Sequence, residues 1–119
     1  MRRVLVVNDE ERTRAIAAKL LESHGYCVDL ATDGADAIEL LSAASYDAVI
    51  LDVVMPRVDG RGVLVHLART NPTMIGRTVL VATAVQEAVE AQLDEVCRVL
   101  VKPVAVNQLM DAIDECVAA

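Results

Sequence analysis

The sequence predicts an α/β fold, in which a central sheet of five parallel strands lies between two layers of helices. Two observations lead to this class. Short apolar runs alternate along the chain with longer segments whose apolar residues recur at helical spacing, which indicates repeated strand–helix units. The run Ala48–Leu51 is apolar at every position, as expected for a strand that is covered on both faces.

The first half of the chain is predicted to hold three strands and two helices. The first helix has Ile16, Leu20 and Leu21 on one face, and Gly25 is its stop signal. The predicted order is strand Val4–Val7, helix Glu11–His24, strand Cys27–Ala31, helix Gly34–Ala43 and strand Ala48–Leu51.

The second half continues the alternation. The third helix is expected to end at Asn71-Pro72, because a residue before proline disfavours helical backbone. The fourth helix is short, acidic and weakly amphipathic. The predicted order is helix Gly60–Arg69, strand Thr78–Ala82, helix Gln86–Glu95, strand Val99–Val101 and helix Val106–Val117.

Composition limits the classes of protein. With 119 residues, 55% of them hydrophobic and 24% charged, the chain is expected to form one globular domain over residues 1–119. Its net charge of −7 argues against binding to a nucleic-acid phosphate backbone. No apolar stretch reaches the ~20 residues that span a bilayer. We therefore expect a cytoplasmic location, without direct binding to nucleic acid or membrane.

The core is expected to be aliphatic, because Phe and Trp are absent and Tyr26 and Tyr46 are the two aromatic residues. The cysteines Cys27, Cys97 and Cys116 are odd in number and lack CxxC spacing. We expect them to be small core residues, and not metal ligands or redox groups.

Four polar residues, Asp9, Asp52, Thr83 and Lys102, each lie at or just past the end of a predicted strand. Right-handed crossovers place the carboxyl ends of parallel strands on one edge of the sheet, where open α/β folds place their sites. Two carboxylates there suit Mg²⁺, and a carboxylate can also accept a phosphoryl group as an aspartyl phosphate. A lysine and a hydroxyl would supply the hydrogen bonds and charge that phosphoryl transfer requires.

The sequence resembles the receiver domain of bacterial two-component response regulators from about Arg2 to Val117. The residues that carry the resemblance are Val4–Glu10, Asp47–Pro56, Asp59-Gly60, Val81–Ala84 and Val101–Pro103. The resemblance implies the flavodoxin-like (βα)5 three-layer sandwich. It also implies that the chain is a phosphoacceptor regulatory domain and not an enzyme. The dipeptide Asp59-Gly60 is itself interpreted as turn chemistry.

The resemblance also implies roles for single residues. Asp52 would accept a phosphoryl group from a histidine kinase or a histidine phosphotransfer protein, and switch a surface that binds a downstream protein. Thr83 would be the switch hydroxyl, and Lys102 would pair with the phosphoryl group and precede a cis bond to Pro103.

The cofactor implied by the resemblance is Mg²⁺. Its ligands would be the side chains of Asp9 and Asp52 and the backbone carbonyl of Val54, with Asn8 or Glu10 acting through water.

The chain departs from the family at two positions. Asn8 stands where the family usually has a second acid, which predicts weaker Mg²⁺ binding but not loss of the site. Val99 stands where the family often has an aromatic residue that moves on phosphorylation. We therefore expect phosphorylation to be transmitted to the surface in another way, through remodelling of residues 86–95.

An alternative function is a pseudo-receiver that only binds a protein partner. Asn8 and Val99 favour it, whereas the presence of Asp9, Asp52, Thr83 and Lys102 opposes it. A metal-dependent phosphohydrolase is disfavoured because Val54 occupies the position of its general acid, and a nucleotide or flavin site because no glycine-rich loop follows Val7. Since no output region follows Val117, we expect a stand-alone regulator or a receiver from a longer chain, such as a hybrid histidine kinase.

Overall fold

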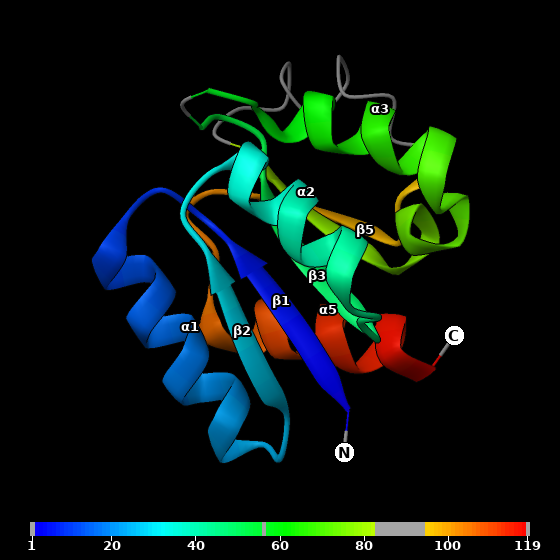
Figure 1. The fold of residues 1–119 in the computed structure, drawn as a ribbon. Coiled ribbons are helices and arrows are strands. Elements are labelled where there is room, and N and C mark those ends of the chain that lie inside the picture. Colours follow the sequence, from blue (N-terminus) through cyan, green and yellow to red (C-terminus); the bar gives the residue numbers. More distant parts are fainter. Residues whose placement is uncertain (1, 56, 83–94, 119) are drawn as a thin grey trace.

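The computed structural model describes residues 2–55, 57–82 and 95–118, and it forms a three-layer α/β sandwich (Figure 1). The middle layer is a parallel sheet of five strands in the order β2-β1-β3-β4-β5. The strands are β1 (Arg3–Val7), β2 (Cys27–Ala31), β3 (Ala48–Asp52), β4 (Thr78–Ala82) and β5 (Arg98–Val101). The predicted fold class is confirmed.

Helices cover both faces of this sheet: α1 and α5 lie on one face, and α2 and α3 on the other (Figure 1). A short 3-10 helix, η1, connects α3 to β4. The bounds are α1 (Glu11–Ser23), α2 (Gly34–Ala43), α3 (Gly60–Thr70), η1 (Pro72–Arg77) and α5 (Val106–Ala118).

The predicted elements agree with these bounds to within one residue at each end. The sequence did not predict η1, in which a proline starts a tight turn and Met74 and Ile75 are buried. The predicted helix at 86–95 falls, except for its last residue, outside the described residues. Among the described helices, none is both long and apolar enough to cross a membrane.

Two aliphatic clusters fill the space between the layers, as the composition predicts. Strand residues alternate between the clusters, because successive side chains of a strand point to opposite faces. Leu5 and Val7 pack with Leu67 on the α2 and α3 side, whereas Val4 and Val6 pack with residues of α1 and α5 on the other side. The central strand β3 is buried along its whole length, which explains its continuous hydrophobicity.

The strand order creates a crevice at the carboxyl end of the sheet. β1 pairs with β2 on one side and with β3 on the other, and β3 pairs with β4. The chain therefore leaves β1 toward one edge of the sheet and leaves β3 toward the opposite edge. In open α/β sheets, such a switch point is where ligands bind. Asn8 and Asp9 follow β1, Asp52 is the last residue of β3, and Lys102 follows β5.

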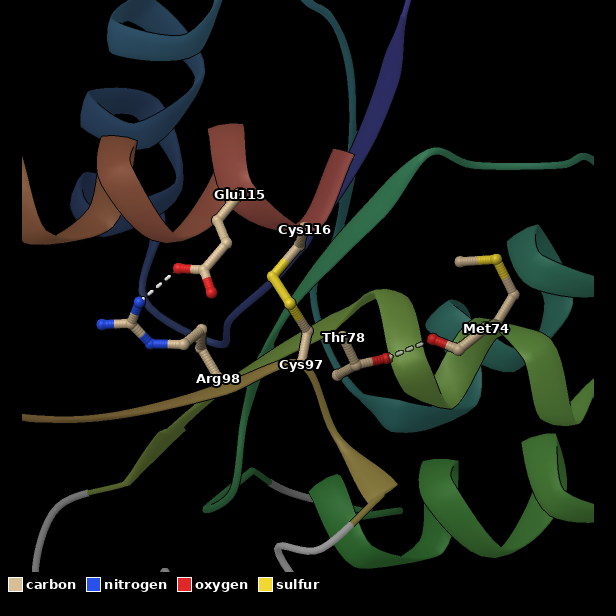
Figure 2. The surroundings of a disulfide bond; sticks show 6 residues. All are labelled: Met74, Thr78, Cys97, Arg98, Glu115 and Cys116. Carbon is tan, nitrogen blue, oxygen red and sulfur yellow. Dashed lines mark hydrogen bonds and ion pairs between the residues drawn. A yellow bond between two sulfur atoms is a disulfide. The ribbon is translucent and has the colours of Figure 1, made fainter. Parts of the chain in front are cut away.

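The expectation that all three cysteines are merely small core residues is wrong. Cys97 and Cys116 form a disulfide, with their Cα atoms 5.9 Å apart, while Cys27 is free. The bond joins the residue before β5 to α5 (Figure 2). A separation of 19 residues carries no local signal of pairing, and only the packing of α5 against the sheet brings the two sulfur atoms together.

Candidate functional site

Asp52 is held rigidly at the end of the central strand. Its backbone lies in register with Val81 of β4, and the N–H of the next residue, Val53, donates to the carbonyl of Val81 at 2.9 Å. The Asp52 side chain is 2% exposed. An ionised carboxylate at this depth requires partners, because burying a charge without them is costly.

Two donors meet at one oxygen of that carboxylate. Nζ of Lys102 and Nδ2 of Asn8 each donate to Oδ2 of Asp52, and both distances are 3.0 Å. The other oxygen, Oδ1, is buried and has no hydrogen-bond partner. The site therefore brings together residues from the carboxyl ends of three different strands, and it leaves one carboxylate oxygen without a hydrogen-bond partner.

The orientation of Asn8 follows from its own contacts. Its Oδ1 accepts from the backbone N–H of Glu10 at 2.8 Å, so its amide nitrogen faces Asp52. Arg14 of α1 donates to the Asn8 carbonyl at 2.8 Å and ties this loop to the helix. Asn8 is thus a direct donor to Asp52, a role that its place beside Asp9 in the sequence did not suggest.

The charge state of Asp52 reflects competing effects. Burial raises its pKa above the ordinary value, the hydrogen bond and charge of Lys102 lower it, and the nearby negative charge of Asp9 raises it. Burial has the largest effect, so the pKa is raised overall. The site favours a cation or an electrophile that would relieve the buried negative charge.

The remaining predicted residues have different placements. Asp9 is exposed, and its charge is near enough to raise the pKa of Asp52. The carboxylate of Glu10 accepts from the hydroxyl of Thr13 at 2.6 Å, on the first turn of α1. Val54, whose carbonyl is a predicted metal ligand, is 54% exposed. Thr83 lies outside the described residues.

The segment after Asp52 is packed closely against two helices. The Asp59 side chain caps α3 by accepting from the N–H of Gly62 at 3.0 Å, so Asp59 is a helix cap and Gly60 is the first residue of α3, where the sequence predicted turn chemistry. The Gly60 N–H donates to the carbonyl of Val53 at 2.8 Å. A Cβ at Gly60 would lie 2.7 Å from the carbonyl oxygen of Asp52, which explains why this position has no side chain.

A second close approach holds the same segment from the other side. Arg57, with φ of 66°, forms an ion pair with Asp33, the residue that caps α2, at 2.7 Å. A Cβ at Gly34 would lie 1.9 Å from the carbonyl oxygen of Val58. No sequence pattern pointed to these contacts, because they join residues that are distant along the chain.

A cavity of about 580 Å³ adjoins the carboxylate. It lies between α1 and the start of α5, and its floor includes Asn8, Asp52 and Lys102. Its walls are mainly apolar, with Ile16 and Val106 each 58% exposed at its margin. The Lys102–Pro103 peptide bond is cis, as the resemblance implied, and this loop forms part of the wall.

Comparison with known proteins identifies the family. The model of the "Response regulator receiver domain" family matches residues 4–114. The chain belongs to the response regulator receiver domain family. The response regulator MprA of Mycolicibacterium vanbaalenii is 39% identical to this receiver domain in an alignment of 114 positions, which covers 91% of the chain and 47% of MprA. The chain thus spans about half the length of the curated relatives that it matches.

Solved structures show the same receiver fold. The response regulator TrrA of Thermotoga maritima, solved in complex with Mg²⁺ and BeF, is 25% identical, with a TM-score of 0.88 over 98% of this chain and 99% of TrrA. The receiver domain of a sensor histidine kinase from Pseudomonas aeruginosa is 22% identical, with a TM-score of 0.89 over 99% of this chain and 98% of that domain.

The donor set of the site fits a hard divalent cation. Asp52 Oδ1 is a buried oxygen without a partner, and the carboxylate of Asp9 is near enough to raise the pKa of Asp52. Oxygen atoms of this kind are what Mg²⁺ binds in proteins. Within the described residues, no group of three His, Cys, Asp or Glu side chains could hold a metal ion. A cation at this site would need a backbone oxygen or water in addition to the two carboxylates.

Proposed function

We propose that this receiver domain is a phosphoacceptor, in which Asp52 takes a phosphoryl group from a phosphohistidine donor. The observation that carries the proposal is the state of the Asp52 carboxylate. One oxygen is held by Lys102 and Asn8, while the other is buried and unsatisfied. A carboxylate fixed in this way is preorganised to attack an electrophile, because its orientation is set before the donor arrives.

Each residue has a defined task in the transfer. A carboxylate oxygen of Asp52 forms a bond to phosphorus as the bond from phosphorus to the imidazole nitrogen of the donor breaks. Lys102 remains within hydrogen-bond distance of the site and neutralises part of the charge on the phosphoryl oxygens. Asn8 fixes the carboxylate by its amide donor. Thr83 is proposed as the hydroxyl that binds the phosphoryl group afterwards.

The proposed cofactor is Mg²⁺, held by the side chains of Asp9 and Asp52 and the carbonyl of Val54, with Asn8 or Glu10 acting through water. When bound, the cation supplies the positive charge that phosphoryl transfer to a carboxylate requires. The TrrA structure with Mg²⁺ and BeF supports this assignment. Asp9 would contribute an exposed carboxylate near Asp52, which a cation can approach with its waters.

The proposed donor is a histidine kinase or a histidine phosphotransfer protein, in the cytoplasm. The open cavity beside Asp52 supports this, since a histidine side chain carried by a protein must reach a residue that is 2% exposed. The downstream partner is proposed to be a protein that binds the altered surface. No role in binding DNA is assigned to the receiver domain itself, whose sequence has a net charge of −7.

The test is phosphorylation of the purified chain by acetyl phosphate in the presence of Mg²⁺, followed by intact-mass measurement. We expect wild type to gain the mass of one phosphoryl group, and Asp52→Asn to gain none. Lys102→Ala should take up the group much more slowly, by roughly 10²-fold or more, if its charge acts on the transferring phosphoryl.

The alternative is a pseudo-receiver that binds a partner without phosphorylation. The direct hydrogen bond from Asn8 to Asp52 favours it, because the amide occupies an oxygen that a cation could use. Wild type and Asp52→Asn that both remain unmodified, by acetyl phosphate and by a phosphorylated histidine phosphotransfer protein, would establish this alternative.

A further inference from the structure

The disulfide between Cys97 and Cys116 lies on the two elements that frame Lys102. Cys97 immediately precedes β5, Lys102 immediately follows β5, and Cys116 lies near the end of α5. The covalent ring closed by the bond therefore contains the edge strand, the cis-proline loop and most of α5. The disulfide therefore constrains the segment that carries Lys102.

The contacts around the bond differ on its two sides. The N–H of Cys97 donates to the carbonyl of Thr78 at 2.9 Å, and the Thr78 hydroxyl donates to the carbonyl of Met74 at 2.8 Å. These bonds fix the start of β5 to β4 whatever the state of the sulfur atoms. Figure 2 shows the bond between Thr78 and Met74 beside Cys97, and Cys116 on α5 at the other end of the disulfide.

A second link joins the same two elements. Arg98 forms an ion pair with Glu115, and each of these residues is the chain neighbour of a bonded cysteine (Figure 2). Both side chains are largely exposed, so the pair holds the alignment of β5 and α5 weakly. The strand and the helix should thus stay together when the disulfide opens, but with more freedom.

The fold has an extensive core besides the disulfide, although Cys116 belongs to one of the two core clusters and Cys97 packs against it. Permanent disulfides are dense in small domains that cannot build a sufficient core, whereas this chain has one aliphatic cluster on each face of its sheet. In a reducing compartment such as the cytoplasm expected from the sequence, disulfides are usually catalytic or redox-sensing. These points favour a reversible bond.

We propose that Cys97 and Cys116 form a reversible thiol–disulfide site, which acts as a redox input to the receiver domain by fastening β5 and α5 together when oxidised. The partner class is a dithiol reductant for opening, and a disulfide oxidant for closing. This site is separate from Asp52, although its effect on phosphorylation rests on the proposed function.

The exchange has a defined direction of attack. Cys116 is fully buried, whereas Cys97 is partly exposed, so the thiolate of the reductant attacks the Cys97 sulfur. A mixed disulfide forms with Cys97, and Cys116 leaves as a thiolate that takes up a proton. The second thiol of the reductant then attacks its own sulfur in the mixed disulfide and releases Cys97 as a thiol. Two electrons and two protons pass to the protein, and the reductant leaves as a disulfide.

The first experiment tests the chemistry without reference to phosphorylation. The folded protein, without denaturant, is equilibrated with dithiothreitol at graded ratios of reduced to oxidised reagent. Exchange is then quenched with acid, and the free thiols are alkylated after unfolding, because Cys116 is buried in the fold, and counted by mass. We expect one labelled cysteine at the oxidising end and three at the reducing end, with Cys27→Ser showing none and two. A bond that opens only after denaturant is added, or never forms, overturns the proposal.

The second experiment measures the mechanical consequence. Hydrogen exchange of β5 and of the last turns of α5 is compared between the oxidised and reduced forms of wild type and of Cys97→Ser. We expect exchange there to be roughly 10-fold faster or more in reduced wild type and in Cys97→Ser under both conditions, with β1 and β2 unchanged. Equal exchange in the two redox forms of wild type contradicts the proposed fastening.

The link to Asp52 is read from the rate of phosphorylation by acetyl phosphate in the two redox forms. A difference that Cys97→Ser abolishes and Cys27→Ser retains supports the redox input, and equal rates overturn that part of the proposal. If Asp52 takes up no phosphoryl group in either form, the proposed function fails while the thiol and hydrogen-exchange results still decide the redox site.

Discussion

Replacement of Gly60 by alanine tests how closely α3 packs on the strand end that carries Asp52. A Cβ at this position would lie 2.7 Å from the Asp52 carbonyl oxygen and 2.8 Å from the Cα of Val53. Both are backbone atoms, which cannot move aside as a flexible side chain can. Ordinary contact begins at 3.4 Å, so α3 and the end of β3 must separate by about 0.7 Å.

The size of the effect follows from two opposed terms. Overpacking of this kind costs about 1–3 kcal/mol. Alanine recovers up to about 1 kcal/mol through its better helix propensity and the lower entropy of the unfolded chain. We expect Gly60→Ala to lower the free energy of unfolding by about 1–2 kcal/mol, which corresponds to a fall of roughly 1 M in the urea midpoint.

The assay is urea unfolding followed by far-UV circular dichroism, because the chain has no Trp for fluorescence. Gly76→Ala is the matched control, since a Cβ there would meet nothing within 4 Å. It should leave the midpoint unchanged or raise it slightly. A Gly60→Ala midpoint equal to that of Gly76→Ala would refute the close packing. Because the clash is with the backbone of Asp52, Gly60→Ala should also be phosphorylated more slowly than wild type. This slowing should be larger than the unfolded fraction of the variant explains.

Three further predictions follow from named contacts. Asn8→Asp should tighten Mg²⁺ binding by roughly 10-fold or more, since a unit charge about 5 Å from a cation contributes about 1–3 kcal/mol; calorimetric titration measures it, and equal or weaker binding would contradict the role given to Asn8. Burial and hydrogen bonds to Asp114 and Asp29 raise the pKa of Tyr26 and Tyr46 to about 12 from 10. The folded state therefore retains these protons longer than the unfolded state, so stability should fall as pH rises above 10, and tyrosinate absorbance should appear near pH 10 in urea but later in the folded protein. Asp59→Ala should cost about 1 kcal/mol by removing the cap of α3, whereas Asp59→Asn should cost little; equal urea midpoints for the two variants would exclude capping.

Local patterns predicted every described strand and α-helix of this fold. The apolar runs of β1 to β4 and the helical spacing in α1 and α5 are properties of neighbouring residues, so the sequence reports them directly. The 3-10 helix η1 was missed, because two buried residues within six do not form a helical pattern. The sequence also predicted that Asp52 and Lys102 lie together, since parallel topology brings both to one edge of the sheet.

The sequence by itself determined the α/β class, the positions of Asp9, Asp52 and Lys102 at strand ends, and the membership implied by their order. Only the tertiary structure decided that Asn8 donates to Asp52, that Gly60 leaves no room for a side chain, and that Cys97 bonds to Cys116. The physical reason is the separation along the chain of the residues that interact. Periodicity and turn chemistry act between neighbours, whereas these three contacts depend on the distances that packing sets between segments far apart in the chain.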